Sequence, residues 1–158
     1  METPISSILA RKGDSIFSVG PQASVSQAVH LMNQMNIGAV AVMEGERLLG
    51  IFTERDVLRR VIDGRMDPDA TPVRKVMTKQ LAYVRPDSLL GEAMAVMSAK
   101  NCRHLPVMED DRLLGVISSR DLIEAALDGR EHEISELMQY ISGSFGPDAV
   151  PVGHGRSI

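Results

Sequence analysis

Two short motifs in this chain place a hydroxyl residue three positions before an aspartate. Thr53 precedes Asp56, and Ser118 precedes Asp121. Each motif follows an apolar run and opens a helical pattern, so the hydroxyl falls where free backbone N–H groups and the helix dipole favour a phosphate. A carboxylate one turn into the helix can accept hydrogen bonds from two adjacent hydroxyls, such as a ribose diol. The motifs therefore predict nucleotide binding at a helix start.

The same spacing also describes a helix cap. A Ser or Thr followed three residues later by an acidic or amide side chain can satisfy the free donors of the helix itself. Duplication copies a cap as faithfully as a ligand site, so the presence of two motifs does not decide between these interpretations. Both stay open at this point.

The two motifs lie in two copies of one sequence unit. A shift of 65 positions aligns residues 21–65 with 86–130 without a gap, and 16 of the 45 aligned pairs are identical. Chance would give roughly three identities at ordinary residue frequencies. A unit of this kind does not close its own core, so each copy is expected to pack on the other.

Each copy has the pattern helix, strand, strand, helix. Apolar residues at three- and four-residue intervals predict a helix over 24–36, and short apolar runs around polar turns predict two hairpins. The last helix of each copy is expected to stop at a glycine, Gly64 and Gly129. A short lead-in strand is expected just ahead of Pro21 and Pro86. The predicted hairpin strands are 39–43, 48–52, 104–108 and 113–117.

These patterns predict a chain with one compact body. The expected organisation is repeat 1 over 3–65, a linker over 66–72, repeat 2 over 73–130, a C-terminal helix over 131–142 and a flexible tail over 143–158.

Composition narrows the class of protein. The net charge of −4 and an aromatic content of 3% give little reason to expect a nucleic-acid partner. No apolar run approaches the length of a membrane span, and no secretory signal is recognisable at the start. A single cysteine, Cys102, excludes an internal disulfide. We therefore expect a cytoplasmic protein without membrane or nucleic-acid partners.

The ungapped repeat, the hairpin that leads into Thr/Ser-x-x-Asp, and the lead-in strand before a proline resemble a tandem of cystathionine-β-synthase-type (CBS) domains. The resemblance covers roughly residues 3–130. It implies a mixed α/β (α+β) fold in which two β-α-β-β-α units pack with pseudo-twofold symmetry. It also implies two clefts between the repeats that bind adenosine-containing ligands. AMP is the foremost expectation, with ATP, ADP, NADH and S-adenosylmethionine as alternatives.

Site residues follow from the resemblance by position. Asp56 and Asp121 are expected to bind ribose hydroxyls, while Thr53 and Ser118 face phosphate. The full predicted set comprises Lys12, Gly13, Asp14, Ile37, Gly38, Ala39, Thr53, Arg55, Asp56, Arg103, His104, Pro106, Ser118, Arg120 and Asp121.

The two copies differ most at the start of the first hairpin strand. Residues 37–39 read Ile-Gly-Ala and are expected to line an adenine cleft, whereas residues 102–104 read Cys-Arg-His and offer charge to a phosphate. Residues 12–14 are expected to close over the ligand. We therefore predict one well-formed site that combines Thr53 and Asp56 with the Arg-His pair, and a second site at Asp121.

The predicted function is regulatory rather than catalytic. The sequence lacks a glycine-rich phosphate loop and the common hydrolase motifs. Cys102 is interpreted as a small buried apolar residue, although its basic neighbours could lower its thiol pKa. The expected protein is a nucleotide sensor without a catalytic cofactor or metal, and its regulated target is a separate, unknown chain. The alternative is a ligand-free structural or protein-interaction module.

The resemblance further implies a homodimer. The apolar stripes at Leu58/Ile62 and Ile123/Leu127, together with the predicted helix over 131–141, are the expected contact surfaces.

Overall fold

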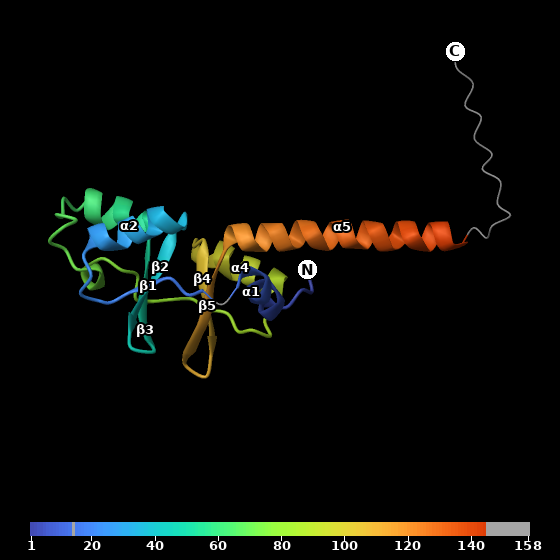
Figure 1. The fold of residues 1–158 in the computed structure, drawn as a ribbon, viewed down its shortest axis with the longest axis horizontal. Coiled ribbons are helices and arrows are strands. Elements are labelled where there is room, and N and C mark those ends of the chain that lie inside the picture. The colour runs from blue at the N-terminus through green and yellow to red at the C-terminus, as the bar shows by residue number, and fades with distance from the viewer. Residues whose placement is uncertain (14, 145–158) are drawn as a thin grey trace, which may run out of the picture.

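The computed structural model describes residues 1–13 and 15–144. Two similar halves lie side by side, and one long helix runs out beyond them (Figure 1). The first half contains β1 (Ser18–Val19), α2 (Val25–Met35), β2 (Ala39–Glu44), β3 (Arg47–Thr53), α3 (Glu54–Asp56) and the π-helical segment η1 (Val57–Ile62). The second contains α4 (Leu90–Lys100), β4 (His104–Glu109), β5 (Arg112–Ser118) and α5 (Ser119–Ser144). Two further elements are α1 (Ile5–Lys12) and the 3-10 turn η2 (Val73–Lys75).

The two hairpins have the same register. β2 pairs antiparallel with β3 so that Ala39 lies opposite Thr53, and β4 pairs with β5 so that His104 lies opposite Ser118. Both hairpins have one register shift at the equivalent place along the strand, and β3 contacts β5 across the two halves. These features confirm the predicted mixed α/β fold of two like units, with the end of each hairpin leading into a Thr/Ser-x-x-Asp motif.

The lead-in strands differ between the halves. β1 pairs in parallel with β2, so that Ser18 lies opposite Ala41. In the second half the same place holds a single parallel bridge between Val84 and Val107. Both lead-in segments therefore run beside the first hairpin strand of their own half. The predicted lead-in strand forms in the first half and is reduced to a single bridge in the second.

The segments α1 and η2 are exchanged between the halves. Ile5 and Ile8 of α1 are buried in the core of the second half, although α1 precedes the first half in the chain. Val73 of η2 is buried in the core of the first half, and its N–H donates to the Ala23 oxygen at 2.8 Å. Each half is thus completed by the segment that precedes the other half in sequence.

This exchange explains two glycines that are identical between the copies. A Cβ atom at Gly115 would lie 2.6 Å from a methyl carbon of Leu9 in α1. A Cβ atom at Gly50 would lie 2.7 Å from the backbone oxygen of Thr78, which follows η2. Both distances are too short for a real side chain, so glycine permits the exchanged segments to pack against β3 and β5.

The predicted stop at Gly64 agrees with the structure, for a reason other than the expected left-handed glycine. η1 ends at Ile62, and the residue with a positive φ is Arg65, at 53°. A Cβ atom at Gly64 would lie 2.2 Å from the Arg60 oxygen, so glycine is required by close approach rather than by its φ angle.

The predicted stop at Gly129 is wrong. α5 runs from Ser119 through Gly129 to Ser144, and the helix expected separately over 131–142 is its second part. After Gly64 the chain reaches Pro68 within four residues, whereas the apolar spacing beyond Gly129 continues the helical pattern. The tail predicted over 143–158 falls almost wholly outside the described residues.

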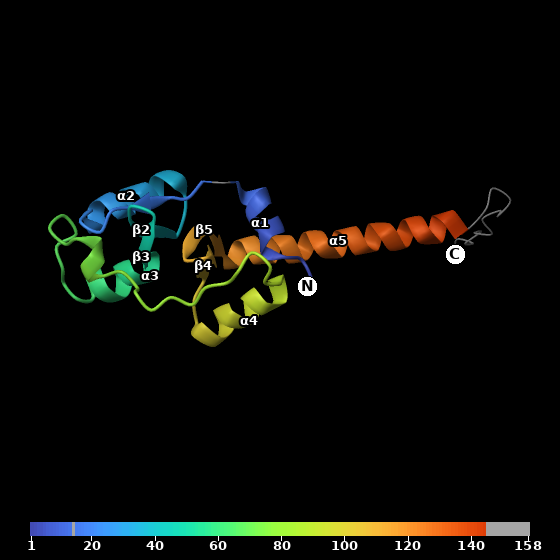
Figure 2. The same ribbon diagram turned by 90° about the horizontal axis from the view of Figure 1, so that it is seen from below.

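α5 projects from the body in two perpendicular views (Figures 1 and 2). Its first turns pack against α1 and α4, and its later turns extend past every other element. Among the described residues, no helix combines the length and apolar character that crossing a bilayer requires.

Candidate functional site

A cavity of about 890 Å³ lies where the two halves meet. The first half supplies the end of β3, α3 and η1, and the second supplies the last residues of α4 and the start of β4. The segment that follows η2 forms a third wall. The residues that line the cavity are Ile51, Thr53, Glu54, Arg55, Asp56, Leu58, Arg59, Arg60, Thr78, Gln80, Leu81, Ala82, Lys100, Asn101, Cys102, Arg103 and His104.

Asp56 is buried at the floor of this cavity and already accepts several hydrogen bonds. Its carboxylate accepts from the Thr53 N–H at 3.0 Å and from the Thr53 hydroxyl at 3.2 Å. The Asp56 N–H in turn donates to the hydroxyl oxygen of Thr53. The Thr78 hydroxyl donates to Oδ1 at 3.0 Å, and Arg60 Nε lies 3.6 Å from the same oxygen. The capping interpretation is therefore correct for this motif, and Oδ1 is the atom that can still accept from a ligand.

Arg55 joins the halves across the cavity. Its guanidinium donates to the backbone oxygen of Asn101, the left-handed residue that ends α4. The equivalent Arg120 instead pairs with Glu124 along the exposed surface of α5. The pseudo-symmetry is broken here, and the first motif alone connects to the other half through its arginine.

The cavity has an excess of positive charge. Five cationic side chains line it, against the carboxylates of Glu54 and Asp56. Arg55 and Arg60 are engaged with backbone oxygens. The side chains of Arg59, Lys100 and Arg103 make no ion pair or hydrogen bond with any described residue. Free cations around a hollow attract an anion, so the cavity is suited to a phosphate-bearing ligand.

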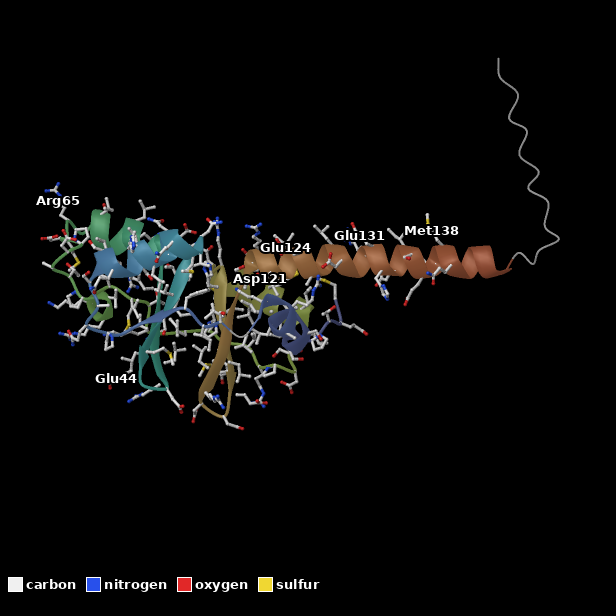
Figure 3. All side chains as sticks on the ribbon, viewed as in Figure 1. Glu44, Arg65, Asp121, Glu124, Glu131 and Met138 are labelled. Carbon is white, nitrogen blue, oxygen red and sulfur yellow. The ribbon has the colours of Figure 1, made fainter. Side chains whose placement is uncertain are left out.

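The second motif is in contact with Lys12. Lys12 Nζ donates to Asp121 Oδ2 at 2.8 Å and to the Val116 oxygen at 2.8 Å. Asp121 also accepts from the Ser118 N–H at 2.7 Å, which makes this motif a helix cap as well. The hydrogen bonds from Lys12 and Ser118 outweigh burial and lower the pKa of the Asp121 carboxyl. Figure 3 shows Asp121 where α5 leaves the body.

His104 lies between the two motifs. Burial lowers the pKa of its imidazole, with Lys12 and Arg103 acting in the same direction and with the carboxylates of Glu54 and Asp121 opposing them. Gly38 faces it from the first half, because a Cβ atom there would lie 3.3 Å from His104 Cε1 and 2.7 Å from Glu54 Oε1. The small residue of one copy therefore leaves room for the imidazole of the other.

Cys102 is a poor nucleophile in this setting. Burial raises the pKa of its thiol, and the nearby Arg55 guanidinium offsets this only in part. Cys102 was predicted to be buried and is partly exposed in the structure, and the suggestion that its basic neighbours lower its pKa is wrong. A thiol that stays protonated near neutral pH is inert toward most electrophiles.

The structure gathers the residues predicted for the better site. Thr53, Arg55, Asp56, Arg103 and His104 all line the cavity. Lys12, Ser118 and Asp121 meet at the equivalent place in the second half.

The other predicted residues that the structure describes do not line the cavity. Ile37 packs against the first core, and Ala39 pairs with Thr53 in the hairpin. Pro106 is buried in β4, where its oxygen accepts from the Val84 N–H at 3.0 Å. Gly13 ends α1 with a φ of 92°. Arg120 is exposed on α5, and Asp14 lies outside the described residues.

The sequence interpretation missed the third wall. Thr78, Gln80 and Leu81 precede the lead-in of the second copy, at the place where 12–14 precede the lead-in of the first. The correspondence between the copies indicates this segment as a candidate wall of the site, because residues 12–14 were already predicted to close over the ligand. Lys100 and Arg59 carried no local signal, because they are charged residues on otherwise ordinary helices.

Comparison with known proteins identifies the repeat. The family model described as "CBS domain" matches residues 5–63 and 73–128. The CBS domain-containing protein CBSX3, mitochondrial, of Arabidopsis thaliana is 33% identical over 152 residues, which are 90% of this chain and 74% of that protein. The CBS domain-containing protein YhcV of Bacillus subtilis is 33% identical, covering 75% of this chain and 84% of its own length.

Solved structures agree with the same assignment. A protein with CBS domains from Burkholderia ambifaria, assigned to signal transduction, superposes with a TM-score of 0.77 at 36% identity. The match covers 80% of this chain and 95% of that one. The repeat, the exchanged segments and these matches show that this chain belongs to the CBS-domain proteins and carries two CBS domains in tandem.

Proposed function

We propose that this chain is a regulatory module that binds a phosphate-bearing adenine nucleotide between its two CBS domains. The observation that carries the proposal is the cavity of about 890 Å³ with five cations and two carboxylates on its walls. Its size lies within the range of small-molecule sites. The assignment of a CBS-domain relative to signal transduction supports a regulatory role.

The lining offers a place for each part of a nucleotide. Leu58, Leu81 and Ala82 provide apolar surface for a base, and Asp56 Oδ1 lies where a ribose hydroxyl can donate. Arg103 and Lys100 are free to bind phosphate. The cationic excess favours AMP, ADP, ATP or NADH over S-adenosylmethionine, whose sulfonium carries positive charge.

Ligand occupancy can become a signal because the site spans both halves. A nucleotide that contacts η1 and β4 together stabilises one relative orientation of the two domains by its difference in affinity for the alternatives. A separate protein that binds this orientation would be the regulated target. The raised thiol pKa of Cys102 supports a binding role over a catalytic one. A cytoplasmic location is part of the proposal.

Thermal melts with millimolar AMP, ADP, ATP, NADH and S-adenosylmethionine test this function. A binding ligand raises Tm by mass action, with about 2.7 kcal/mol of stabilisation at one hundred times Kd. Sodium triphosphate is the control that separates simple anion attraction from recognition of the nucleoside. If none of the five ligands raises Tm, the alternative of a ligand-free interaction module replaces this proposal.

We also propose that two copies of the chain associate through α5 and η1. Leu58 and Ile62 of η1 are 65% and 62% exposed, and Ile134 and Leu137 of α5 are 54% and 60% exposed. A projecting helix with an apolar stripe is marginal in water by itself, so a partner surface is needed to stabilise it. Figure 3 shows the two surfaces at opposite ends of the molecule, with Arg65 at one end and Glu131 on the helix at the other.

The charges favour contact between α5 of one copy and η1 of the other over contact between the two α5 helices. The α5 stripe is flanked by three glutamates, Glu131, Glu133 and Glu136, against Arg130 and His132. The η1 surface carries Arg59 and Arg65 against Asp63. Two acidic helices placed together repel each other, while the acidic stripe of one copy complements the basic surface of another. A twofold axis would make both contacts at once.

A further inference from the structure

We infer that Lys12 fills the place beside Asp121 that corresponds to the ligand place beside Asp56, and that it limits the chain to one bound nucleotide. The inference rests on the proposed function of the cavity at Asp56 and adds which of the two equivalent places a ligand can use.

In the first half, Thr78 fills the place next to Asp56. The Thr78 N–H donates to the Ile51 oxygen at 2.8 Å, so the chain after η2 lies along β3 as a short bridge. The Thr78 hydroxyl donates to Asp56 Oδ1 at 3.0 Å. One residue thus donates twice, from its backbone to the strand and from its side chain to the carboxylate.

Lys12 makes both contacts in the second half with a single ammonium group. Val116 is the counterpart of Ile51, and its oxygen accepts from Lys12 Nζ at 2.8 Å. Asp121 is the counterpart of Asp56, and its Oδ2 accepts from the same nitrogen at 2.8 Å. The long side chain reaches in from the end of α1, where Gly13 turns the chain away with a φ of 92°.

The consequence for a ligand differs between a hydroxyl and an ammonium group. The Thr78 hydroxyl can stay beside a ribose, because it both donates and accepts. Lys12 only donates, and its ammonium group occupies the space beside the Asp121 carboxylate, on Oδ2, the same oxygen that accepts from the Ser118 N–H. The Asp121 side chain is 19% exposed, so a ligand must break a partly shielded ion pair to reach it.

The residues around the two motifs also differ between the halves. None of the residues that line the cavity comes from the Ser118–Asp121 motif, while Arg103 and His104 of the second half turn toward the first motif. A second ion pair, between Arg11 and Asp128, fixes the end of α1 against α5. Lys12 is therefore held over Asp121 by the packing of its own helix.

Calorimetric titration with ATP tests the inference on the full chain. Lys12→Met retains the aliphatic stem without the ammonium, and Lys12→Gln is a second variant with a shorter polar group should the first fold poorly. Arg11→Met is the matched control, because it removes the neighbouring ion pair on the same helix. We expect one ATP per chain for the wild type and Arg11→Met, and two for Lys12→Met. Adding Asp121→Ala to Lys12→Met should return the value to one.

Each outcome separates the two proposals. One site in both the wild type and the Lys12 variants overturns the role of Lys12 and leaves the cavity proposal standing. Two sites in the wild type also overturn it, as does weaker binding by Lys12→Met at unchanged stoichiometry. No binding to the wild type but one site in Lys12→Met overturns the cavity proposal and supports the role of Lys12. No binding to any form overturns both.

Discussion

At the scale of single residues, the two aspartates have a structural role that exists without ligand. Asp56 and Asp121 each lie in the first turn of a helix and accept from the N–H of the residue that precedes it, Thr53 or Ser118. Each also binds an exchanged segment, through Thr78 or Lys12. A binding role is added to this one rather than replacing it. Variants at these positions must therefore be judged by stability and affinity separately.

We expect Asp56→Ala to lower the free energy of unfolding by about 2 kcal/mol and Asp121→Ala by about 1 kcal/mol. Asp56 is 5% exposed, and its loss removes a cap and leaves the Thr78 hydroxyl without its acceptor. Asp121 is more exposed, and its partner Lys12 can turn to water. Urea unfolding without ligand measures both values. Equal stability of Asp56→Ala and the wild type would show that the cap contributes nothing.

His104 predicts a dependence of stability on pH. Because burial lowers the pKa of the folded-state imidazole, the unfolded chain binds the proton more readily, and stability falls as pH drops below the unfolded value of about 6.5. We expect His104→Gln to show a smaller loss of unfolding free energy between pH 7 and pH 5. His30→Gln, on the exposed face of α2, is the control and should retain the wild-type slope. A slope unchanged in His104→Gln would contradict the assignment.

The sequence predicted residue roles only where the motif is local. The Thr53–Asp56 and Ser118–Asp121 pairs lie three residues apart, so their spacing alone indicated both capping and binding. Lys12 lies 109 residues from Asp121, and no local pattern connects them. Its partner became visible only with the exchange of α1.

At the scale of elements, one unit has been copied into two environments. The hairpins kept their register, and the final helices diverged into a short π-helical η1 and a long α5. Local periodicity predicted the hairpins and α2 well, because their burial is decided within one copy. It failed at Gly129, where the residues beyond the copy decide whether the helix continues.

The two equivalent glycines should respond in opposite ways to the same substitution. Gly129→Ala is expected to stabilise α5 by roughly 0.5–1 kcal/mol, because no atom lies within 4 Å of the added carbon and alanine favours helices. Gly64→Ala should destabilise the first half by about 1–3 kcal/mol, because its Cβ would lie 2.2 Å from the Arg60 oxygen. Circular dichroism during thermal unfolding measures both. The same sign for both variants would refute the distinction.

At the scale of the whole molecule, two lobes share their outer segments and one helix extends beyond them. The repeat in the sequence predicted the two lobes and their packing. It did not predict that α1 and η2 change places, because a pattern repeated in both copies fits either half equally. Gly50 and Gly115 permit the close approach of the exchanged segments, and they too are alike in both copies.

Association of two copies is expected to depend on both surfaces proposed for it. Ile134→Glu on α5 and Ile62→Glu on η1 should each convert a dimer into a monomer in sedimentation velocity, because each buries a charge in an apolar contact. Tyr83→Glu is the control, since Tyr83 is 60% exposed and lies on neither surface. The dimer should also weaken as salt is raised. Wild-type sedimentation of Ile134→Glu would remove α5 from the interface.

The cationic cavity between the two CBS domains is proposed to bind a nucleotide. The most direct measurement is the affinity for ATP of the wild type, of Lys100→Met/Arg103→Met, and of a control, Arg47→Met/Arg112→Met, that removes two hairpin arginines outside the cavity. We expect the cavity variant to bind ATP at least about tenfold more weakly. A tenfold increase in Kd is a loss of roughly 1.4 kcal/mol of binding free energy, about what one charged hydrogen bond contributes. The control should bind like the wild type. Absence of ATP binding by the wild type at millimolar concentration would show that the cavity is not a nucleotide site. An equal loss of ATP affinity in both double variants would show the same.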